Sequence, residues 1–348
     1  MIRLIVLLIG LAGFKNLAAQ REILWCDRPI AVKPLHPLQR IAFGSCAKQT
    51  REQPILKEIV NVHPDLMIYL GDNIYGDSRD TFKLKEKYGM LSCKPEFRKL
   101  LANVPTIATW DDHDYGKDDA GAEYPMKAAT KRLFLDFWNE PLTSSRWNGH
   151  EGIYHALYYG DSATKVQILL LDLRTFRTTL IGRDYHYEAN ADSMATMLGS
   201  AQWQWLSSEL KKPARVRIIC SSTQFGTEHN GWECWDNFPK EQQRMFDLIK
   251  ETKANGVIFF SGDVHYAELS MRKLDGLYPI YDMTSSGLTH REHKPAKNRY
   301  RIGEALNERN FGLLDINWGA HPTLLFRGFD WTGHERIIQE VKLDDLKF

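Results

Sequence analysis

The chain of 348 residues has the composition of a globular protein, with 43% hydrophobic and 26% charged residues. Its 45 basic and 44 acidic residues leave a formal net charge of +1, without any block of like charges. This balance argues against a nucleic-acid or polyanion surface. The length suits one large α/β domain or two small ones.

The N-terminus has the layout of a secretory signal peptide. Arg3 supplies a positive charge, residues 4–13 are apolar, and Ala18 and Ala19 are small residues suited to cleavage. The apolar stretch is too short to span a bilayer comfortably, and no later stretch is long and apolar enough to do so. We therefore predict a signal peptide over residues 1–20, export to the periplasm or the medium, and a single domain over residues 21–348.

Five cysteines follow the predicted cleavage point: Cys26, Cys46, Cys93, Cys220 and Cys234. An exported chain tends to oxidise its cysteines. Four of the five can pair in three ways, and the odd one out would be free to act as a ligand or nucleophile.

The first half of the chain predicts a β-α-β unit. Apolar runs at Arg40–Gly44 and Leu66–Leu70 have strand length, and the segment between them has helical spacing over residues 54–62. This order implies parallel strands with a right-handed crossover. Residues 82–101 are predicted mostly helical with a break near 92–95, and residues 105–109 form a third strand.

Strands and helices continue to alternate up to residue 260. We predict helices over 126–138, 201–210 and 240–251, and strands over 166–171, 216–220 and 256–260. Residues 147–160 are expected to form a strand pair or a loop over the site, and the polar residues 175–200 a lid. The remainder predicts strands over 278–284, 311–318, 323–330 and 337–343, with one short helix near 303–308. We expect these strands to form a second sheet packed on the first.

Potential ligands follow four of the predicted strands. They are Cys46 in G-S-C, Asp72 and Tyr75 in G-D-N-I-Y, Asp112 and His113 in W-D-D-H-D, and Asp263 and His265 in S-G-D-V-H. The C-terminal ends of parallel strands share one edge of a sheet, so these loops can converge. Each motif alone also fits an ordinary turn; the crowding of three carboxylates around His113 is what favours a bound cation, because their mutual repulsion is otherwise unrelieved.

The mixed donor set suits more than one metal. Thiolate and imidazole favour Fe or Zn, whereas carboxylate oxygens favour Ca, Mg or Mn. A carboxylate such as Asp72 is placed to bridge two ions, and two ions about 3.5–4 Å apart can clamp an in-line displacement at phosphorus. After a later strand, Arg174 has two open interpretations: it binds a phosphate through a bidentate contact, or it pairs at the surface with Asp172.

These motifs together resemble the metallophosphoesterase pattern of the purple acid phosphatases and, more closely, the PhoD-like alkaline phosphatase family, in G-S-C, W-D-D-H, D-x-R and S-G-D-x-H. The resemblance runs from about Arg40 to about Leu314. It implies a four-layer α/β/β/α fold, two sheets sandwiched between helices.

The resemblance also implies roles for individual residues. Cys46 and Tyr75 would bind Fe(III), Asp72 would bridge the ions, and Asp263 and His265 would be ligands to the second ion and to iron. Asp112 stands where the family has a metal-binding Asn. His113 would be the catalytic histidine and Arg174 would hold the phosphate. Gln224 stands where purple acid phosphatases have a His ligand, which leaves its role open.

The sequence therefore predicts an exported enzyme that hydrolyses phosphate monoesters or diesters by attack of a metal-bound hydroxide, with Fe(III) and a divalent ion (Ca, Mn, Mg or Zn) as cofactors. One alternative is a phospholipase D-like phosphodiesterase using the same site. Others are a metal- or phosphate-binding protein without turnover, and a purely structural exported domain that binds no metal.

Overall fold

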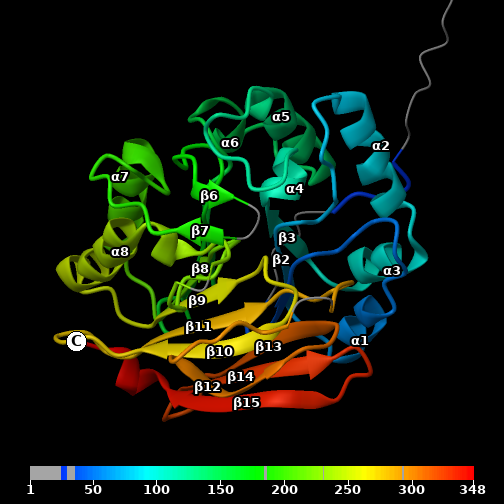
Figure 1. Cartoon of the computed structure of the whole chain (residues 1–348). Helices are drawn as coiled ribbons and strands as arrows, with labels where there is room; N and C mark the ends of the chain where they lie inside the picture. Colours follow the sequence, from blue (N-terminus) through cyan, green and yellow to red (C-terminus); the bar gives the residue numbers. More distant parts are fainter. Residues whose placement is uncertain (1–24, 30–35, 184–185, 230, 292–293) are drawn as a thin grey trace, which may run out of the picture.

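The computed structural model describes residues 25–29, 36–183, 186–229, 231–291 and 294–348. The predicted signal peptide lies outside these residues. Two large sheets lie face to face, with helices on the outer face of each (Figure 1). This is the predicted four-layer arrangement.

The first sheet has the order β15-β14-β13-β1-β2-β3. Its strands are β1 (Arg40–Gly44), β2 (Leu66–Leu70), β3 (Thr106–Thr109), β13 (Asn310–Asn317), β14 (Thr323–Asp330) and β15 (Glu335–Lys342). Strands β1, β2 and β3 are parallel, and β13 pairs antiparallel with β1. Pairing with β13 brings residues from both ends of the chain into one sheet.

The second sheet has the order β12-β10-β11-β9-β8-β5-β4. Its strands are β4 (His155–Tyr159), β5 (Val166–Leu170), β8 (Val216–Cys220), β9 (Val257–Ser261), β10 (Ala267–Arg272), β11 (Ile280–Ser285) and β12 (Arg301–Leu306). Strands β5, β8, β9 and β11 run parallel. Strands β6 (Ile181–Arg183) and β7 (His186–Glu188) form a separate antiparallel pair.

The alternation of side chains along β2 shows why the sheet lies between two layers. Leu66, Ile68 and Leu70 face the core shared with the second sheet, whereas Met67 and Tyr69 face a separate core beneath the helices. All five are fully buried. A strand covered on both faces has to be apolar throughout, as this one is.

The helices divide between the two outer faces. Residues of α1 (Ile55–Asn61), α2 (Thr81–Ser92), α3 (Pro95–Asn103) and α5 (Lys127–Phe137) pack on the first sheet, and those of α7 (Gly199–Leu210) and α8 (Pro239–Thr252) on the second. Two short helices, α4 (Asp112–Tyr115) and α6 (Ser145–Asn148), lie in connections, together with 3₁₀ turns at Trp235–Asn237 and Leu343–Leu346. The core shared by both sheets supports the predicted single domain over residues 21–348, which stays a proposal.

Two predictions for individual segments need correction, and one strand was not predicted. The segment predicted as a short helix at 303–308 belongs to strand β12, where Arg301 forms an ion pair with Glu268 of β10 at 2.5 Å. Pairing along a sheet edge therefore outweighs local helix propensity. Strand β10 was not expected. The segment 147–160 contains the end of α6 and the edge strand β4. None of its residues lines the site cavity.

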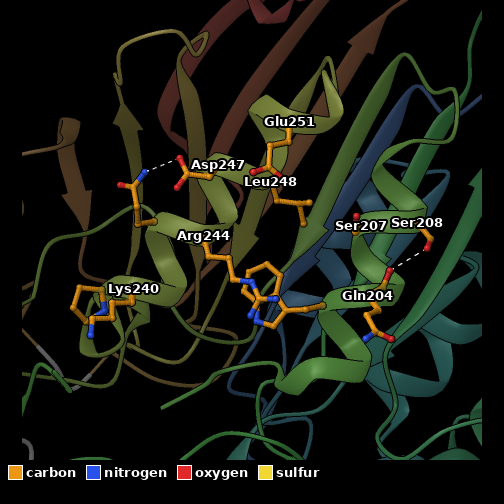
Figure 2. Close-up of a pocket in the computed structure, with 11 residues that line it drawn as sticks. Gln204, Ser207, Ser208, Lys240, Arg244, Asp247, Leu248 and Glu251 are labelled. Carbon is orange, nitrogen blue, oxygen red and sulfur yellow. Dashed lines mark hydrogen bonds between the residues drawn. The ribbon is translucent and has the colours of Figure 1, made fainter. Parts of the chain in front are cut away.

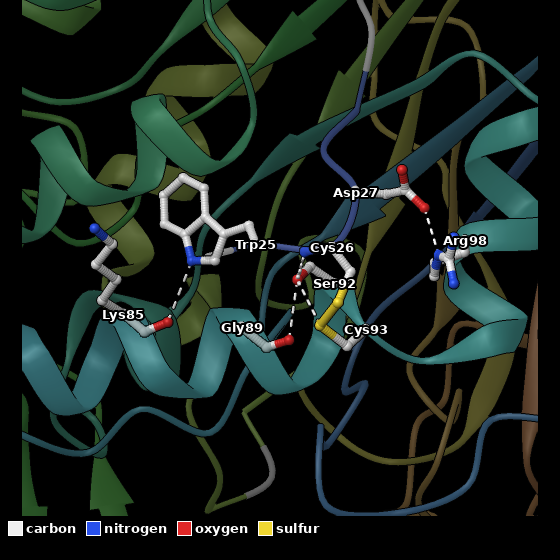
Figure 3. Close-up of a disulfide and its surroundings, with 8 residues drawn as sticks. All are labelled: Trp25, Cys26, Asp27, Lys85, Gly89, Ser92, Cys93 and Arg98. Carbon is white, nitrogen blue, oxygen red and sulfur yellow. Dashed lines mark hydrogen bonds and ion pairs between the residues drawn. A yellow bond between two sulfur atoms is a disulfide. The ribbon is translucent and has the colours of Figure 1, made fainter. Parts of the chain in front are cut away.

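The cysteines pair less completely than expected. Cys26 forms a disulfide with Cys93, which ties the N-terminal segment to the end of α2 (Figure 3). Cys46, Cys220 and Cys234 are free and buried. Cys46 therefore escapes pairing, as predicted, but so do two thiols that were expected to oxidise.

Candidate metal centre

The predicted ligands converge where the C-terminal ends of strands from the two sheets meet. Ligand atoms of Cys46, Asp72 and His265 lie within 4.8 Å of one another, and so do those of Asp72, Asp112 and His113. A third group of the same compactness consists of Asp72, Asp111, Asp112 and Asp263. Asp72 belongs to all three groups, so it occupies the centre of the cluster.

The backbone at this cluster is strained. Cys46, Asp72, Asp263 and His265 all have positive φ angles, between 51° and 77°. Residues other than glycine rarely adopt this region, and such conformations concentrate at functional sites. Backbone bonds hold the loops in place: the Ala47 amide donates to the Asp72 carbonyl at 2.8 Å.

Cys46 and Tyr75 lie on the same side of Asp72. The Cys46 thiol donates to Asp72 Oδ2 at 3.4 Å, and the Tyr75 hydroxyl lies 3.1 Å from His265 Nε2. Burial raises the pKa of both groups, and the negative charge of Asp72 adds to that effect. Each would need a nearby cation to ionise at neutral pH.

The acidic residues that follow β3 have different roles. Asp114 accepts backbone hydrogen bonds from Asn73, Ile74 and Asp111, so it supports the loop rather than facing the cluster. Asp112 accepts from the Asp119 amide at 2.8 Å through Oδ2. Its Oδ1 is buried and has no hydrogen-bond partner among the described residues, and the same holds for Asp72 Oδ1.

His113 lies beside Tyr75, with ring centroids 4.1 Å apart. Its Nδ1 is 2.7 Å from Asp77, and its Nε2 is 3.7 Å from Asp118. Burial acts to lower the pKa of His113, but Asp112 and Asp72 outweigh it and raise the pKa to about 12. This acidic setting favours the protonated ring.

Arg174 is fully buried rather than at the surface. Its guanidinium contacts Asp111 at 2.5 Å and Glu233 at 2.8 Å, while Asp172 accepts only from its backbone amide. The surface pairing with Asp172 is therefore wrong. In this arrangement Arg174 neutralises carboxylates behind the cluster, and a contact with phosphate stays a prediction.

Gln224 does not reach the cluster. Its amide donates to Glu268 at 2.8 Å and to Thr284 at 3.1 Å, within the second sheet. Asp111 belonged to the acidic cluster predicted to favour a cation but had no role of its own, whereas Glu233 comes from an aromatic-rich loop with no motif and was not predicted. His290, stacked on His265 at 4.2 Å, gave no sequence signal either.

The cavity at the cluster measures only about 60 Å³. It is lined by Asp72, Asp112, His113, Asp118, Asp119, Tyr187, Trp232, Glu233, Asp263, Val264 and His265. A much larger groove, about 900 Å³, lies between α7 and α8, where Arg244 stacks over Trp203 at 4.4 Å (Figure 2). None of the predicted site residues lines that groove, so size alone does not locate the chemistry.

The sequence matches the model of the family described as PhoD-like phosphatase over residues 41–297, which is more than half of the chain. The chain belongs to the PhoD-like phosphatase family. Alkaline phosphatase D of Bacillus subtilis (strain 168) is 24% identical over 293 residues, which cover 72% of this chain and 49% of that protein. The chain thus spans about half the length of this curated relative.

Solved structures agree on the fold. The structure of PhoD aligns with a TM-score of 0.68 and 17% identity, covering 89% of this chain and 70% of that one. The purple acid phosphatase PPD1 from yellow lupin (Lupinus luteus) seeds aligns with a TM-score of 0.63 and 12% identity, covering 90% and 56%. Both confirm a metallophosphatase-like fold.

Membership of the PhoD-like phosphatase family implies metal ions, and the residues present fit them. Asp72 Oδ1 and Asp112 Oδ1 are buried acceptors without hydrogen-bond partners among the described residues, and the Arg174 guanidinium lies 3.7 Å from Asp112 Oδ1. Such orphaned oxygens are costly unless a cation or water satisfies them. Thiol, phenol, imidazole and carboxylate donors surround the same point, a set that can serve two different ions side by side.

Proposed function

We propose that this PhoD-like phosphatase is a metal-dependent hydrolase of phosphate esters, and that the residues predicted from the motifs form its site. The observation that carries the proposal is the position of Asp72, whose carboxylate belongs to three separate groups of potential ligands. One carboxylate shared in this way suits a bridge between two ions.

The proposed roles follow from which potential ligands lie close together. Cys46, Tyr75 and His265 lie together and would hold one ion, for which we propose Fe(III); Asp112 and Asp263 would hold a divalent ion, Ca, Mn, Mg or Zn. When bound, such ions supply Lewis-acid activation of water and stabilise negative charge at phosphorus.

His113 is the proposed general acid. Its acidic surroundings favour the protonated ring, and the bond between its Nδ1 and Asp77 orients the ring, which leaves Nε2 on the side of the cavity rim. From there it would protonate the departing oxygen. Arg174 would keep Asp111 and Glu233 in position from behind, and its direct contact with the phosphate is a separate proposal.

We also propose that the protein is exported. The Cys26–Cys93 disulfide supports this proposal, because such bonds persist mainly in oxidising compartments. Among the described residues, we find no helix long and apolar enough to cross a bilayer.

The decisive experiment combines elemental analysis of the purified protein with assays on aryl phosphate monoesters and diesters. We expect bound iron with a second metal, and hydrolysis of at least one ester class. A phenolate bound to Fe(III) should colour the oxidised protein, and Tyr75→Phe should bleach that band while the fold stays intact. A colourless wild-type protein with full iron occupancy would contradict the assignment of Tyr75.

Three alternatives are distinguishable by the same measurements. A phospholipase D-like phosphodiesterase would hydrolyse diesters alone, and a binding protein without turnover would hold metal and phosphate but release no product. A purely structural domain would bind no metal. The buried, unsatisfied oxygens of Asp72 and Asp112 argue against the last of these.

A further inference from the structure

A separate pocket lies away from the candidate metal centre, beside the edge strands of the two sheets. It measures about 370 Å³, within the range of about 300–1,000 Å³ that is usual for small-molecule sites. Its walls come from β3 and β4, each the last strand of its sheet, and from the connection between α5 and α6. It shares no lining residue with the cavity at the metal centre.

The apolar side chains of this edge pocket belong to the main core. Leu170 is almost fully buried in the core shared by the two sheets, and Ile107 and Leu157 pack against that core while staying partly exposed. Apolar surface left open beside a core is stabilised when another apolar group covers it. The edge pocket therefore favours an occupant that is largely apolar.

The charges in the edge pocket cancel. Arg146 and Glu140 are the charged residues that line it, and they form a nearly buried ion pair at 2.9 Å. Burial and the neighbouring Arg146 lower the pKa of His155 to about 4, so the third titratable side chain is neutral at pH 7. The lining thus offers no net charge to an ionic ligand.

The edge pocket also has polar groups without partners. In the part of the chain that the structure describes, no hydrogen bond is made by the imidazole of His155, the hydroxyl of Tyr159 or the indole Nε1 of Trp138. Tyr159 and Trp138 are more than nine-tenths buried, and buried polar groups normally have a partner. His155 is only partly buried, so its ring is the most accessible of the three.

We propose that the edge pocket binds an uncharged, largely apolar small molecule carrying a hydroxyl or carbonyl group, with the His155 imidazole as its hydrogen-bond partner. A neutral imidazole has one donor and one acceptor, so it can bind either group. Alternation along β4 places Leu157 and Tyr159 on the same face as His155, beside such a ligand. The proposal goes beyond phosphate-ester hydrolysis and does not depend on it.

Isothermal titration calorimetry of the full purified chain at neutral pH tests this with three probes of similar shape: 4-ethylphenol, ethylbenzene and 4-ethylbenzoate. 4-Ethylphenol should bind one-to-one with a Kd below about 1 mM, a modest affinity for a molecule of its size. 4-Ethylbenzoate should bind at least about tenfold more weakly, because the lining supplies no countercharge for the carboxylate it would desolvate.

A substitution at His155 tests the hydrogen bond. His155→Phe keeps a ring but removes both nitrogens, so it should weaken 4-ethylphenol at least about fivefold, the effect expected for one lost hydrogen bond. Binding of ethylbenzene, which cannot form that bond, should stay the same. Unchanged ethylbenzene binding also shows that the edge pocket is intact in the variant.

A second substitution tests the location. Leu157→Trp should fill the edge pocket and abolish binding of both neutral probes. Leu142→Trp is the matched control, because Leu142 is 87% exposed in the connection between α5 and α6 and does not line the pocket. If Leu157→Trp fails to fold, Thr143→Trp narrows the pocket from an exposed position, and weaker binding of both neutral probes is expected.

Three results would overturn the proposal. They are the absence of saturable 4-ethylphenol binding to wild type, 4-ethylbenzoate binding as tightly as 4-ethylphenol, and affinities unaltered by both tryptophan substitutions in the lining. Equal 4-ethylphenol binding by wild type and His155→Phe would overturn the role of His155. Because each readout is binding, none of these results depends on whether the metal centre hydrolyses phosphate esters.

Discussion

The carboxylates at the candidate centre lie close enough together to repel one another. Burial raises the pKa of Asp111 to about 7 even though Arg174 acts to lower it, and burial together with Asp112 raises that of Asp72. Burial also favours the neutral form of Asp112, but His113 and Arg174 outweigh it and lower its pKa to about 2. Bound cations would stabilise the charged form of all three.

Replacing Asp72 and replacing Arg174 should have different effects on metal content, activity and stability. Asp72→Ala should leave a folded protein that has lost metal and activity, because the residue shared by all ligand groups is gone. Arg174→Ala should retain more activity per folded molecule but unfold more easily by about 3–5 kcal/mol, since it leaves Asp111 buried without its countercharge and Glu233 paired with Arg177 alone.

Metal content, turnover and denaturant unfolding of both variants measure this difference. If Asp72→Ala kept its metals while Arg174→Ala lost more activity per folded molecule, the bridging role of Asp72 would be wrong.

His113 should matter most for esters with poor leaving groups. A more basic departing oxygen gains more from protonation, so His113→Ala should slow alkyl esters by about 10²–10⁴-fold and activated aryl esters less. Metal content should not change. An equal loss on both ester types would mean that His113 acts as a ligand or structural residue. Asp77→Asn provides a milder comparison, because it weakens the bond that orients Nδ1.

At the scale of elements, α2 connects the N-terminal segment with the site loop. Cys93 at its C-terminus is bonded to Cys26, Asp27 forms an ion pair with Arg98 on α3, and Trp25 packs edge-on against Phe137 of α5 (Figure 3 shows the first two). On its other side, α2 supports the site loop through Lys87, which donates to the Gly76 carbonyl at 2.6 Å.

Removing the disulfide should destabilise the fold more than the site. Cys26 and Cys93 are 67 residues apart, and a bond closing a loop of that length typically stabilises by about 2–4 kcal/mol. Cys93→Ser should lower the free energy of unfolding by about that amount, measured with urea. A reductant should have the same effect on wild type and no further effect on the variant; a variant as stable as oxidised wild type would contradict the prediction.

Strand β4 carries a histidine that should make stability depend on pH. Burial and the neighbouring Arg146 lower the pKa of His155 to about 4, against an ordinary 6.5, although Glu140 acts the other way. Between these values the unfolded chain binds a proton that the folded chain does not, so the folded state loses stability as pH falls from about 6.5 to about 4. The slope is at most about 1.4 kcal/mol per pH unit.

His155→Gln should flatten this part of the stability profile, measured by urea unfolding between pH 4 and 7. His321→Gln, at an exposed position, is the matched control and should leave the profile unchanged. A profile identical in wild type and His155→Gln would show that His155 does not titrate differently on folding.

For the whole molecule, the candidate centre joins the two sheets. Cys46, Asp72 and Asp112 follow strands of the first sheet, and Asp263 and His265 follow β9 of the second. Metal bound there would cross-link the sheets at one end. The sheets are otherwise joined by apolar contacts such as the stack of Phe43 on Phe260, with ring centroids 3.7 Å apart.

Chelation should therefore cost both activity and stability. A ligand that binds only the folded state stabilises it by about 2.7 kcal/mol at a hundredfold excess over its Kd, and this contribution disappears on removal. We expect a strong chelator to abolish hydrolysis and lower Tm, and added metal to restore both. Full activity and an unaltered Tm after verified metal removal would contradict the metal-dependent mechanism.

Local sequence determined the parallel strands and the residues placed at their ends. The apolar run Leu66–Leu70 has strand length, and Gly71 ends it with a φ of 108°, so the sequence pattern alone was enough to place Asp72 at the sheet edge. The order of the motifs was sufficient to indicate the family. Both inferences succeed because they depend on chain neighbours and strand direction alone.

Contacts between distant segments decided the rest. Glu233 and Arg174 are 59 positions apart in the sequence, and Tyr187 and Asp119 are 68 apart. Cys46 is free, and its thiol lies 3.4 Å from the hydroxyl of Ser286, 240 positions away. The segment that forms β12 is a strand because it pairs with β10 at the edge of the second sheet. Sequence patterns report the periodicity and turns of one segment, whereas these outcomes depend on which segments the folded sheets bring together.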